Sequence, residues 1–489
     1  MQRANVYFGM KKRPAKKKKV LDNLPYSCYN EGILQKARSI MKIQADFNSV
    51  IGKIKPMHAV GQPPLDHIQT SLFHYLTDAG MPQSRLHDAA GAYGRNQFVD
   101  IPNIFRNFDA DENDPASYSF GFTDIMIKAL IDADVEPYFR LGVTIENFRL
   151  IERLTTYPPA DFEKWARICE HIIRHYNEGW ADGFHYGIRY WEIWNEADDC
   201  LDPNISSMWA APMEEYFRLY DVTAKHLKAC FGDSIKVGGY AATGVNAYAQ
   251  DEKLEGLDRP AKDDEEHRIE FIHGFFRYIK AHGSPIDFFS YHTYNPVATS
   301  VEHVRYYDRL LAKYGYSHVE RHLNEWNLCW AFPGVDPNDK ENPVFAPSTL
   351  AMMLAMQNEA VDILHYYDAR LGTSCCGGLF NAATRQPNNT YWGFHMFNAL
   401  YKLGDQVACS SDDNAVYALA ARNDKRASLV IANTAGETKE IELSLVGVAD
   451  KEIEVMRIDN VYRYTLTGER IKNSKLTVPA YGCVELRFF

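Results

Sequence analysis

Two asparagine–glutamate pairs lie at the ends of two apolar segments of this chain. Glu196 is preceded by Asn195, and Glu325 is preceded by Asn324. A pair of carboxyl groups can cleave a glycosidic bond, one acting as acid and base and the other as nucleophile. The reaction retains configuration when the carboxyl groups lie about 5–5.5 Å apart and inverts it at about 6.5–9.5 Å. The two pairs therefore indicate a glycosidase, if the fold brings them together.

Eight short runs rich in β-branched and aromatic residues predict the strands that would position these glutamates. The runs lie near residues 57–61, 82–87, 136–143, 190–194, 235–240, 286–294, 318–326 and 361–367. Segments of helical period separate them, and Gly80, Gly232 and Gly283 stand where three of the helices would end. This α/β pattern predicts a (β/α)8 TIM barrel, whose functional residues lie at the C-terminal ends of the strands. Glu196 ends the fourth run and Glu325 the seventh, so we expect both carboxyl groups in one barrel mouth.

The barrel is expected to span residues 55–403, because the pattern changes after the last helical segment. Short alternating runs divided by Gly, Asn and Asp predict an antiparallel all-β sandwich domain over residues 404–489. Residues 1–54 form an N-terminal segment that either contributes a strand or helix to this sandwich or caps the barrel floor.

The composition is that of an ordinary globular protein, with 46% hydrophobic and 24% charged residues. The net charge of −11 argues against general binding to nucleic-acid phosphates, and no apolar stretch is long enough for a membrane span. Basic residues near the N-terminus are not followed by an apolar segment, so we expect a cytoplasmic protein. No CxxC or phosphate-loop motif occurs, and we expect neither a metal nor a cofactor. The oligomeric state stays open.

The residues around both glutamates resemble those of glycoside hydrolase family 39 in clan A, which includes β-xylosidases and α-L-iduronidases. Trp194-Asn195-Glu196 is similar to the acid/base motif of the clan, with Ala197 where proline is usual. Residues 322–327 resemble the nucleophile strand of the family. The similarity continues through residues 215–225, 235–239 and 287–294. The resemblance implies a retaining, exo-acting glycosidase whose partner is an oligosaccharide or glycoside, with β-xylosidase-like activity as the leading assignment.

The same resemblance implies roles for individual residues. Glu196 would be the acid/base and Glu325 the nucleophile, while Asn195 would hydrogen-bond the 2-hydroxyl of the sugar. Two histidines would line the sugar subsite, one tyrosine would orient the nucleophile, and two further aromatic residues could stack on a sugar face. These expected substrate-binding residues are His87, His292, Tyr294, Trp330 and Tyr367.

Two departures from the family leave the sugar undetermined. Xylosidases of the family usually continue strand eight with a tryptophan and an acidic pair, whereas this chain has Tyr367, Asp368 and Arg370 there. Arg370 is a candidate for binding a uronate carboxylate, or for an ion pair with Asp368. Asp88 also follows His87 where glycine is usual. Arabinosides, galactosides and uronides therefore remain alternatives to xylosides.

Two other functional classes compete with a glycosidase. A metal-dependent barrel hydrolase or isomerase would need clustered ligands; His171 and His175 have the spacing for one helical face, but we expect them to be solvated on an outer helix. A non-catalytic sugar-binding barrel would not need both Glu196 and Glu325. Both classes are therefore ranked below the glycosidase.

Overall fold

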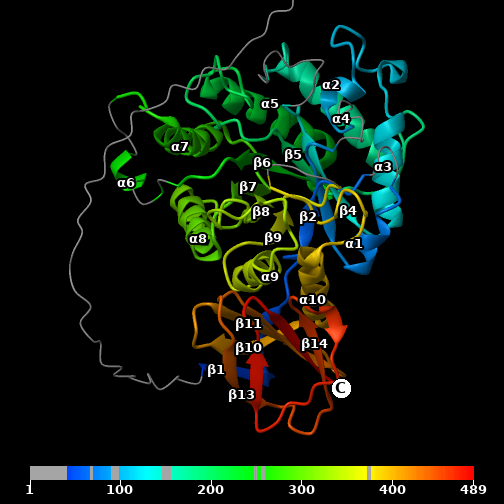
Figure 1. The fold of residues 1–489 in the computed structure, drawn as a ribbon. Helices are drawn as coiled ribbons and strands as arrows, with labels where there is room; N and C mark the ends of the chain where they lie inside the picture. Colours follow the sequence, from blue (N-terminus) through cyan, green and yellow to red (C-terminus); the bar gives the residue numbers. More distant parts are fainter. Residues whose placement is uncertain are drawn as a thin grey trace, which may run out of the picture. The chain divides into compact units, whose positions relative to one another are not determined.

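The structure is a computed structural model that describes residues 41–65, 70–89, 98–145, 156–246, 248, 251–254, 259–371 and 376–489. Within this part of the chain, eight parallel strands form a closed barrel, and nine further strands form a separate mixed sheet (Figure 1). The predicted (β/α)8 barrel with a C-terminal β-unit is therefore confirmed. The basic N-terminal residues lie outside the described part.

The barrel strands follow one another in chain order, and the first closes the barrel against the last. They are β2 (Ala59–Gly61), β3 (Gln83–Leu86), β4 (Glu136–Leu141), β5 (Tyr190–Ile193), β6 (Lys236–Ala242), β7 (Phe288–Thr293), β8 (Glu320–Trp326) and β9 (Ile363–Tyr366). Nearly all of their residues are buried, as expected for parallel strands covered on both faces. Each strand coincides with one of the eight predicted runs.

Helices cover the outside of the barrel. They are α1 (His74–Asp78), α2 (Ile101–Ile104), α3 (Gly121–Asp132), α4 (Phe162–Glu178), α5 (Met213–Phe231), α6 (Asp251–Leu254), α7 (Asp264–His282), α8 (Val297–Tyr314), α9 (Phe345–Met356) and α10 (Asn389–Leu403), with 3-10 turns at Pro115–Ser117 and Gly232–Ser234. The side chain of Asp263 caps the start of α7, and Gly283 ends that helix with a φ of +64°, a conformation that favours glycine. Among the described residues, no helix combines the length and apolar character that crossing a membrane requires.

His171 and His175 lie on the outer helix α4, where both were expected to be solvated. His175 is buried, its ring stacks on Phe120 with centroids 3.6 Å apart, and its Nε2 lies 3.0 Å from an Asp124 carboxylate oxygen. The Nδ1 of His171 lies 2.8 Å from the carbonyl oxygen of Arg167. The prediction that both histidines are solvated was therefore wrong for His175, because the aromatic residues around α4 enclose it.

The second sheet contains β1 (Met41–Lys53), β10 (Asp405–Ser411), β11 (Val416–Arg422), β12 (Ala427–Asn433), β13 (Lys439–Val446), β14 (Ile453–Ile458), β15 (Arg463–Leu466), β16 (Lys475–Val478) and β17 (Cys483–Phe488). Its order is β15-β14-β17-β12-β11-β10-β1-β13-β16. Strand β1 pairs antiparallel with β10 and parallel with β13. The described end of the N-terminal segment therefore contributes a strand to the C-terminal unit, and the expectation of purely antiparallel pairing fails at β1 because this strand does not arrive through a hairpin.

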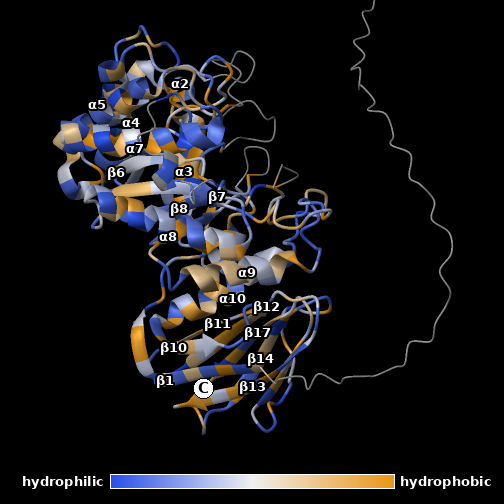
Figure 2. Ribbon diagram, turned by 90° about the vertical axis from the view of Figure 1, so that its left-hand side faces the viewer, coloured by the Kyte–Doolittle hydropathy of each residue, from blue (hydrophilic) through white to orange (hydrophobic). Residues whose placement is uncertain are grey.

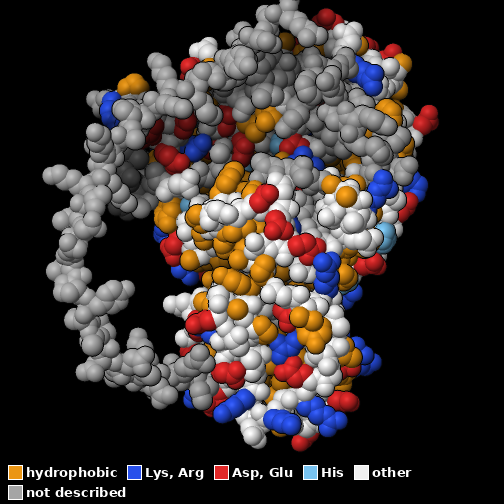
Figure 3. Space-filling view, viewed as in Figure 1, with side chains coloured by type: hydrophobic (Ala, Val, Ile, Leu, Met, Phe, Trp, Pro, Cys, Tyr) orange, Lys and Arg blue, Asp and Glu red, His pale blue; other side chains and the backbone are white. Residues whose placement is uncertain are grey.

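The nine strands form one continuous sheet that curls around its own core, since buried apolar residues of β1, β12, β13, β16 and β17 belong to one cluster. A different set of its residues faces the barrel: Leu419, Ala421, Val430 and Ala432 share a hydrophobic cluster with the barrel helices. Helix α9, almost without hydrophilic colour in Figure 2, packs there with α10 against β11 and β12. Hydrophobic side chains also gather in the region of α8 and α9 in the space-filling view (Figure 3).

Candidate active site

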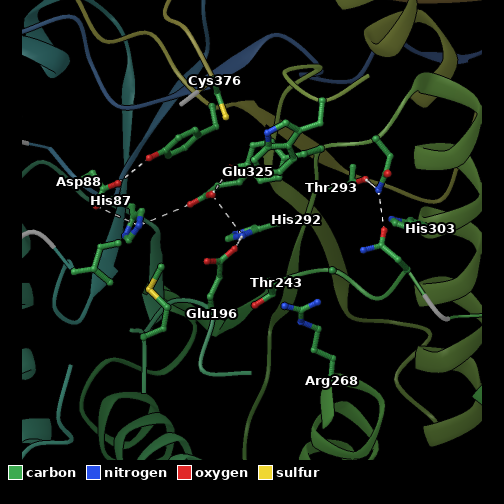
Figure 4. A pocket seen from close by; sticks show the side chains of 18 residues that line it. His87, Asp88, Glu196, Thr243, Arg268, His292, Thr293, His303, Glu325 and Cys376 are labelled. Atoms are coloured by element: carbon green, nitrogen blue, oxygen red, sulfur yellow. Dashed lines mark hydrogen bonds and ion pairs between the residues drawn. The ribbon is translucent and has the colours of Figure 1, made fainter. Parts of the chain in front are cut away.

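Glu196 and Glu325 face one cavity at the C-terminal end of the barrel (Figure 4). Glu196 lies in the loop after β5, and Glu325 is the penultimate residue of β8. An oxygen of one carboxylate lies within 4.8 Å of an oxygen of the other, and the cavity has a volume of about 470 Å³. The strand order predicted this meeting, and the two carboxyl groups are close enough to act on one glycosidic bond.

The backbone at the acid/base candidate is unusual. Trp194 and Glu196 have φ angles of +73° and +46°, in a region that non-glycine residues rarely adopt. The amide of Glu196 donates a hydrogen bond to the carbonyl oxygen of Ala241 on β6, which fixes the turn. Such strain is maintained only where the surrounding structure enforces it, and it is common at functional sites.

Three groups hold the carboxylate of Glu325. Arg85 Nη1 donates to Oε1 at 2.6 Å, and the hydroxyl of Tyr294 donates to Oε2 at 2.7 Å. The ring Nδ1 of His292 lies 3.5 Å from Oε2. Each of these side chains comes from a barrel strand or the residue after one, so the position of Glu325 is rigid.

Arg85 is a further residue of the site that was not predicted from the sequence, although it lies two residues before His87. It is 1% exposed and donates to Asn195 Oδ1 at 2.7 Å as well as to Glu325. Its Nε donates to Glu192 Oε2 at 2.8 Å, and Glu192 also accepts a hydrogen bond from Ser290. The available signal was a cationic residue inside a predicted barrel strand, because a buried cation requires an anionic partner.

His292 lies between the two glutamates and is 2.7 Å from Glu196 Oε1. Burial raises the pKa of Glu196, and the negative charge of Glu325 raises it further, whereas His292 partly opposes the shift. Burial alone would lower the pKa of His292, but the two carboxylates outweigh it and raise that pKa. Glu196 is therefore the carboxyl group that holds a proton more readily.

Glu325 shows the opposite behaviour. Burial favours its neutral form, but the charges of His292 and Arg85 and the hydrogen bond from Tyr294 outweigh burial and lower its pKa. Burial, together with nearby arginines, also lowers the pKa of His87 well below its usual range, so that this imidazole is neutral. The pocket thus places one proton-holding carboxyl beside one ionised carboxylate.

The other sequence-predicted residues divide into two groups. His87, His292, Tyr294, Trp330 and Tyr367 line the cavity together with the two glutamates. Trp330 is 66% exposed at the rim, and its ring centroid lies 5.0 Å from that of Tyr294. Asn195 is not among the lining residues; its amide Nδ2 lies 3.9 Å from the sulfur of Met208, which does line the cavity.

Two tryptophans that flank the glutamates in the sequence are packing residues. Trp194 and Trp326 are at most 1% exposed, and the indole N–H of Trp194 donates to the carbonyl oxygen of Met208. Arg370, the candidate for binding a uronate, donates from Nε to Asp368 Oδ2 at 2.8 Å, with its Nη2 2.7 Å from the same oxygen. The ion pair that was the alternative for Arg370 is therefore present.

Two clusters of the described residues bring three possible metal ligands together. Glu196, His292 and Glu325 form one, but Arg85 already places a cation at Glu325 and opposes another there. The second lies between outer helices α4 and α5 and consists of Glu170, His226 and Cys230. Glu170 in that cluster is paired with an arginine, Arg174.

Comparison with known families and proteins gives a consistent result. The family described as Glycosyl hydrolases family 39 matches residues 33–435. A β-xylosidase of Geobacillus stearothermophilus is 23% identical over 395 residues, which cover 72% of this chain and 69% of that protein. A β-xylosidase of Caldicellulosiruptor saccharolyticus is 26% identical over 276 residues, 53% of this chain and 47% of that protein.

Solved structures show the same fold. A glucosidase of Croceicoccus marinus aligns with a TM-score of 0.70 at 18% identity, covering 92% of this chain and 98% of that one. A family 39 β-xylosidase of Caulobacter crescentus aligns with a TM-score of 0.63 at 18% identity, covering 91% and 99% of the two chains.

Proposed function

The chain belongs to glycosyl hydrolases family 39, and we propose that it is a retaining, exo-acting β-xylosidase-like enzyme with Glu196 as acid/base and Glu325 as nucleophile. One observation carries the assignment: two carboxyl groups in one cavity, with an oxygen of each within 4.8 Å of the other, have pKa values moved in opposite directions. The 470 Å³ cavity is also of the size used for small ligands, which suits a short glycoside.

The reaction begins with protonation of the glycosidic oxygen by Glu196 while Glu325 attacks the anomeric carbon. The bond to the leaving group breaks, and an ester bond joins the sugar to Glu325. Arg85 and Tyr294 keep the attacking carboxylate ionised and oriented. Arg85 also holds the side chain of Asn195, the residue for which the family resemblance implies a hydrogen bond to the 2-hydroxyl of the sugar.

In the second step Glu196 must act as a base, so its pKa must be lower than in the first step. The charge of Glu325 is one cause of the raised pKa of Glu196. Formation of the ester removes that charge, so the pKa of Glu196 falls. Glu196 can then take a proton from water, which attacks the anomeric carbon; the ester bond to Glu325 breaks, its carboxylate is released, and the configuration of the substrate is restored.

The test is the variant Glu325→Ala with an aryl β-xyloside as substrate. Turnover should be lost, because no carboxylate attacks the anomeric carbon. Added azide should enter the vacated space and give a glycosyl azide of inverted configuration, detectable by NMR. Turnover close to that of the unchanged enzyme, or an azide product of retained configuration, would contradict the role of Glu325.

A control variant should be made at an exposed glutamate. Glu302 lies on α8 at the surface. Among the described residues, Arg305 is its ion-pair partner. Glu302→Gln should cleave the xyloside normally and form no azide product. Testing arabinoside, galactoside, glucoside and uronide analogues in parallel would distinguish xylosidase activity from activity on these other sugars.

A further inference from the structure

Asp88 is a carboxylate in the cavity for which the catalytic steps above have no role. It follows β3, has a φ of +53°, and is 5% exposed. Besides the two catalytic glutamates, it is the one acidic residue among the described residues that line the cavity. Aspartate tolerates this backbone conformation better than most residues do, and its burial at the cavity wall makes the carboxylate a candidate for a specific contact.

The carboxylate of Asp88 is held in place but has acceptor capacity to spare. The hydroxyl of Tyr367 donates to Oδ2 at 2.8 Å. Its other oxygen lies 3.3 Å from His87 Nε2 and makes no hydrogen bond within the described part of the chain. An ionised carboxylate offers about four acceptor positions, so Asp88 can accept from further hydroxyl groups.

Asp88 lies on the side of the cavity where the sugar bonded to Glu325 would sit. His87 Nε2 is 3.3 Å from Asp88 and 3.9 Å from the nucleophile. The leaving group must lie by Glu196 instead, where Thr243 and Arg268 line the opposite wall (Figure 4). A contact of Asp88 with the substrate would therefore be with the glycone.

Arg370 acts on Asp88 electrostatically, since Asp88 is among the charges that raise the pKa of Arg370, but the two residues form no direct ion pair among the described contacts. The guanidinium of Arg370 is paired with Asp368 and also donates to the hydroxyl of Tyr367, not to Asp88. A sugar carboxylate on this side would meet Asp88 and Glu325, which carry the same charge. Neutral hydroxyl groups, by contrast, would donate to Asp88.

We propose that Asp88 is the hydroxyl-binding carboxylate of the glycone subsite and that it restricts the enzyme to glycosides of neutral sugars, against uronides. The inference rests on the proposed function, which it deepens by naming the substrate class. Hydrogen bonds to a charged group are among the stronger ones, so losing this contact should reduce kcat/KM about ten- to a hundredfold.

The experiment compares Asp88→Asn with the unchanged enzyme. Asparagine has the same shape and tolerates a positive φ, but it is uncharged and has one acceptor oxygen. The substrates are the neutral aryl glycoside that the unchanged enzyme cleaves best and its 3-deoxy and 4-deoxy analogues. For the unchanged enzyme, one deoxy analogue should lose at least tenfold in kcat/KM. On the parent glycoside, kcat/KM of Asp88→Asn should be lower than that of the unchanged enzyme by a similar factor. For this variant, the kcat/KM values of the parent glycoside and of the same deoxy analogue should then differ by less than threefold.

The matched control is Asp134→Asn. Asp134 also has a positive φ, +59°, but it is exposed and lies before β4 at the other end of the barrel. This variant should behave like the unchanged enzyme on every substrate. Thermal unfolding curves of both variants would show that Asp88→Asn is folded when its kinetics are measured.

Two results would overturn the inference while leaving a retaining glycosidase intact. One is an equal loss on deoxygenation in the unchanged enzyme and in Asp88→Asn, since the contact would then not involve Asp88. The other is cleavage of an aryl uronide at a kcat/KM within tenfold of the neutral glycoside; at least a hundredfold difference is expected. Failure to cleave any aryl glycoside would overturn the proposed function itself.

Discussion

Glu196 and Glu325 carry the same functional group, yet their neighbours give them different protonation behaviour. Burial dominates at Glu196, whereas the charges of His292 and Arg85 outweigh burial at Glu325. The difference in pKa between the two carboxyl groups is thus a property of the surrounding residues. Arg85 is central to this difference, because one guanidinium contacts both Glu325 and Asn195.

These opposite shifts predict a bell-shaped dependence of kcat/KM on pH. Glu325 must be ionised, so activity should fall at low pH as its lowered pKa is crossed. Glu196 must be protonated, so activity should fall at high pH as its raised pKa is crossed. Glu196→Gln should remove the fall at high pH, which kinetics on an aryl glycoside with a good leaving group would measure.

The same variant should discriminate between leaving groups. A poor leaving group needs the proton from Glu196, and its cleavage should slow about 10²- to 10⁴-fold, while an activated aryl glycoside should slow far less. Equal losses on both substrates, or an unchanged fall in activity at high pH, would contradict the acid role of Glu196.

At the scale of elements, the close pairing of β6 with β7 brings the loop after β5 and the end of β7 together. Gly238 on β6 is opposite Phe288 on β7. A Cβ at Gly238 would lie 2.1 Å from the carbonyl oxygen of Phe288, a distance that no real Cβ contact shows. Strands β6 and β7 can therefore pair this closely only because residue 238 has no side chain. The position of His292, at the end of β7, depends in turn on this pairing.

Gly238→Ala should therefore destabilise the protein, because β6 and β7 must separate to admit the methyl group. We expect a loss of about 1–3 kcal/mol in the free energy of unfolding, as for other overpacked sites, measured by urea denaturation. Activity should fall as well, since Glu196 bonds to Ala241 on β6.

Gly121→Ala provides the comparison for this substitution. A Cβ at Gly121, the first residue of α3, meets nothing within 4 Å. That change should leave stability unaltered or slightly increased, because alanine favours helix formation. A Gly238→Ala protein as stable as the Gly121→Ala protein would contradict the steric argument.

At the scale of the whole molecule, the barrel and the curled sheet share apolar core. Val430 and Ala432 of β12 lie in the hydrophobic cluster that includes the barrel helices, while other residues of the sheet form a core of their own. Strand β1 adds a second covalent link, because the chain passes from the sheet into the barrel and returns to the sheet through α10. We therefore expect the two units to unfold together.

Val430→Asp tests this coupling. A charge would be buried without a partner in the shared cluster, which should cost on the order of 3–5 kcal/mol. The melting temperature reported by near-ultraviolet circular dichroism and that reported by loss of activity should fall by the same amount in one transition.

Val446→Asp is the control on the same sheet, because Val446 is 49% exposed. It should change stability by less than about 0.5 kcal/mol. Two separate transitions in Val430→Asp, with the barrel signal unmoved, would show that the units are independent.

Features that depend on local pattern could be predicted from the order of the amino acids alone. Periodicity located the eight barrel strands, glycine marked the end of α7, and strand order predicted that Glu196 and Glu325 share one mouth. The family resemblance proved correct over residues 33–435. These results follow because hydrophobic period and helix termination are set by residues near one another in the chain.

Contacts between groups that are distant in the chain became evident only in the folded molecule. Arg85 reaches Glu325 across 240 positions of sequence, and Tyr367 reaches Asp88 across 279. The pairing of Arg370 with Asp368, the burial of His175 and the insertion of β1 beside β10 were likewise matters of packing. Charges and hydrogen bonds of this kind depend on separation in space and on burial, neither of which a local pattern contains.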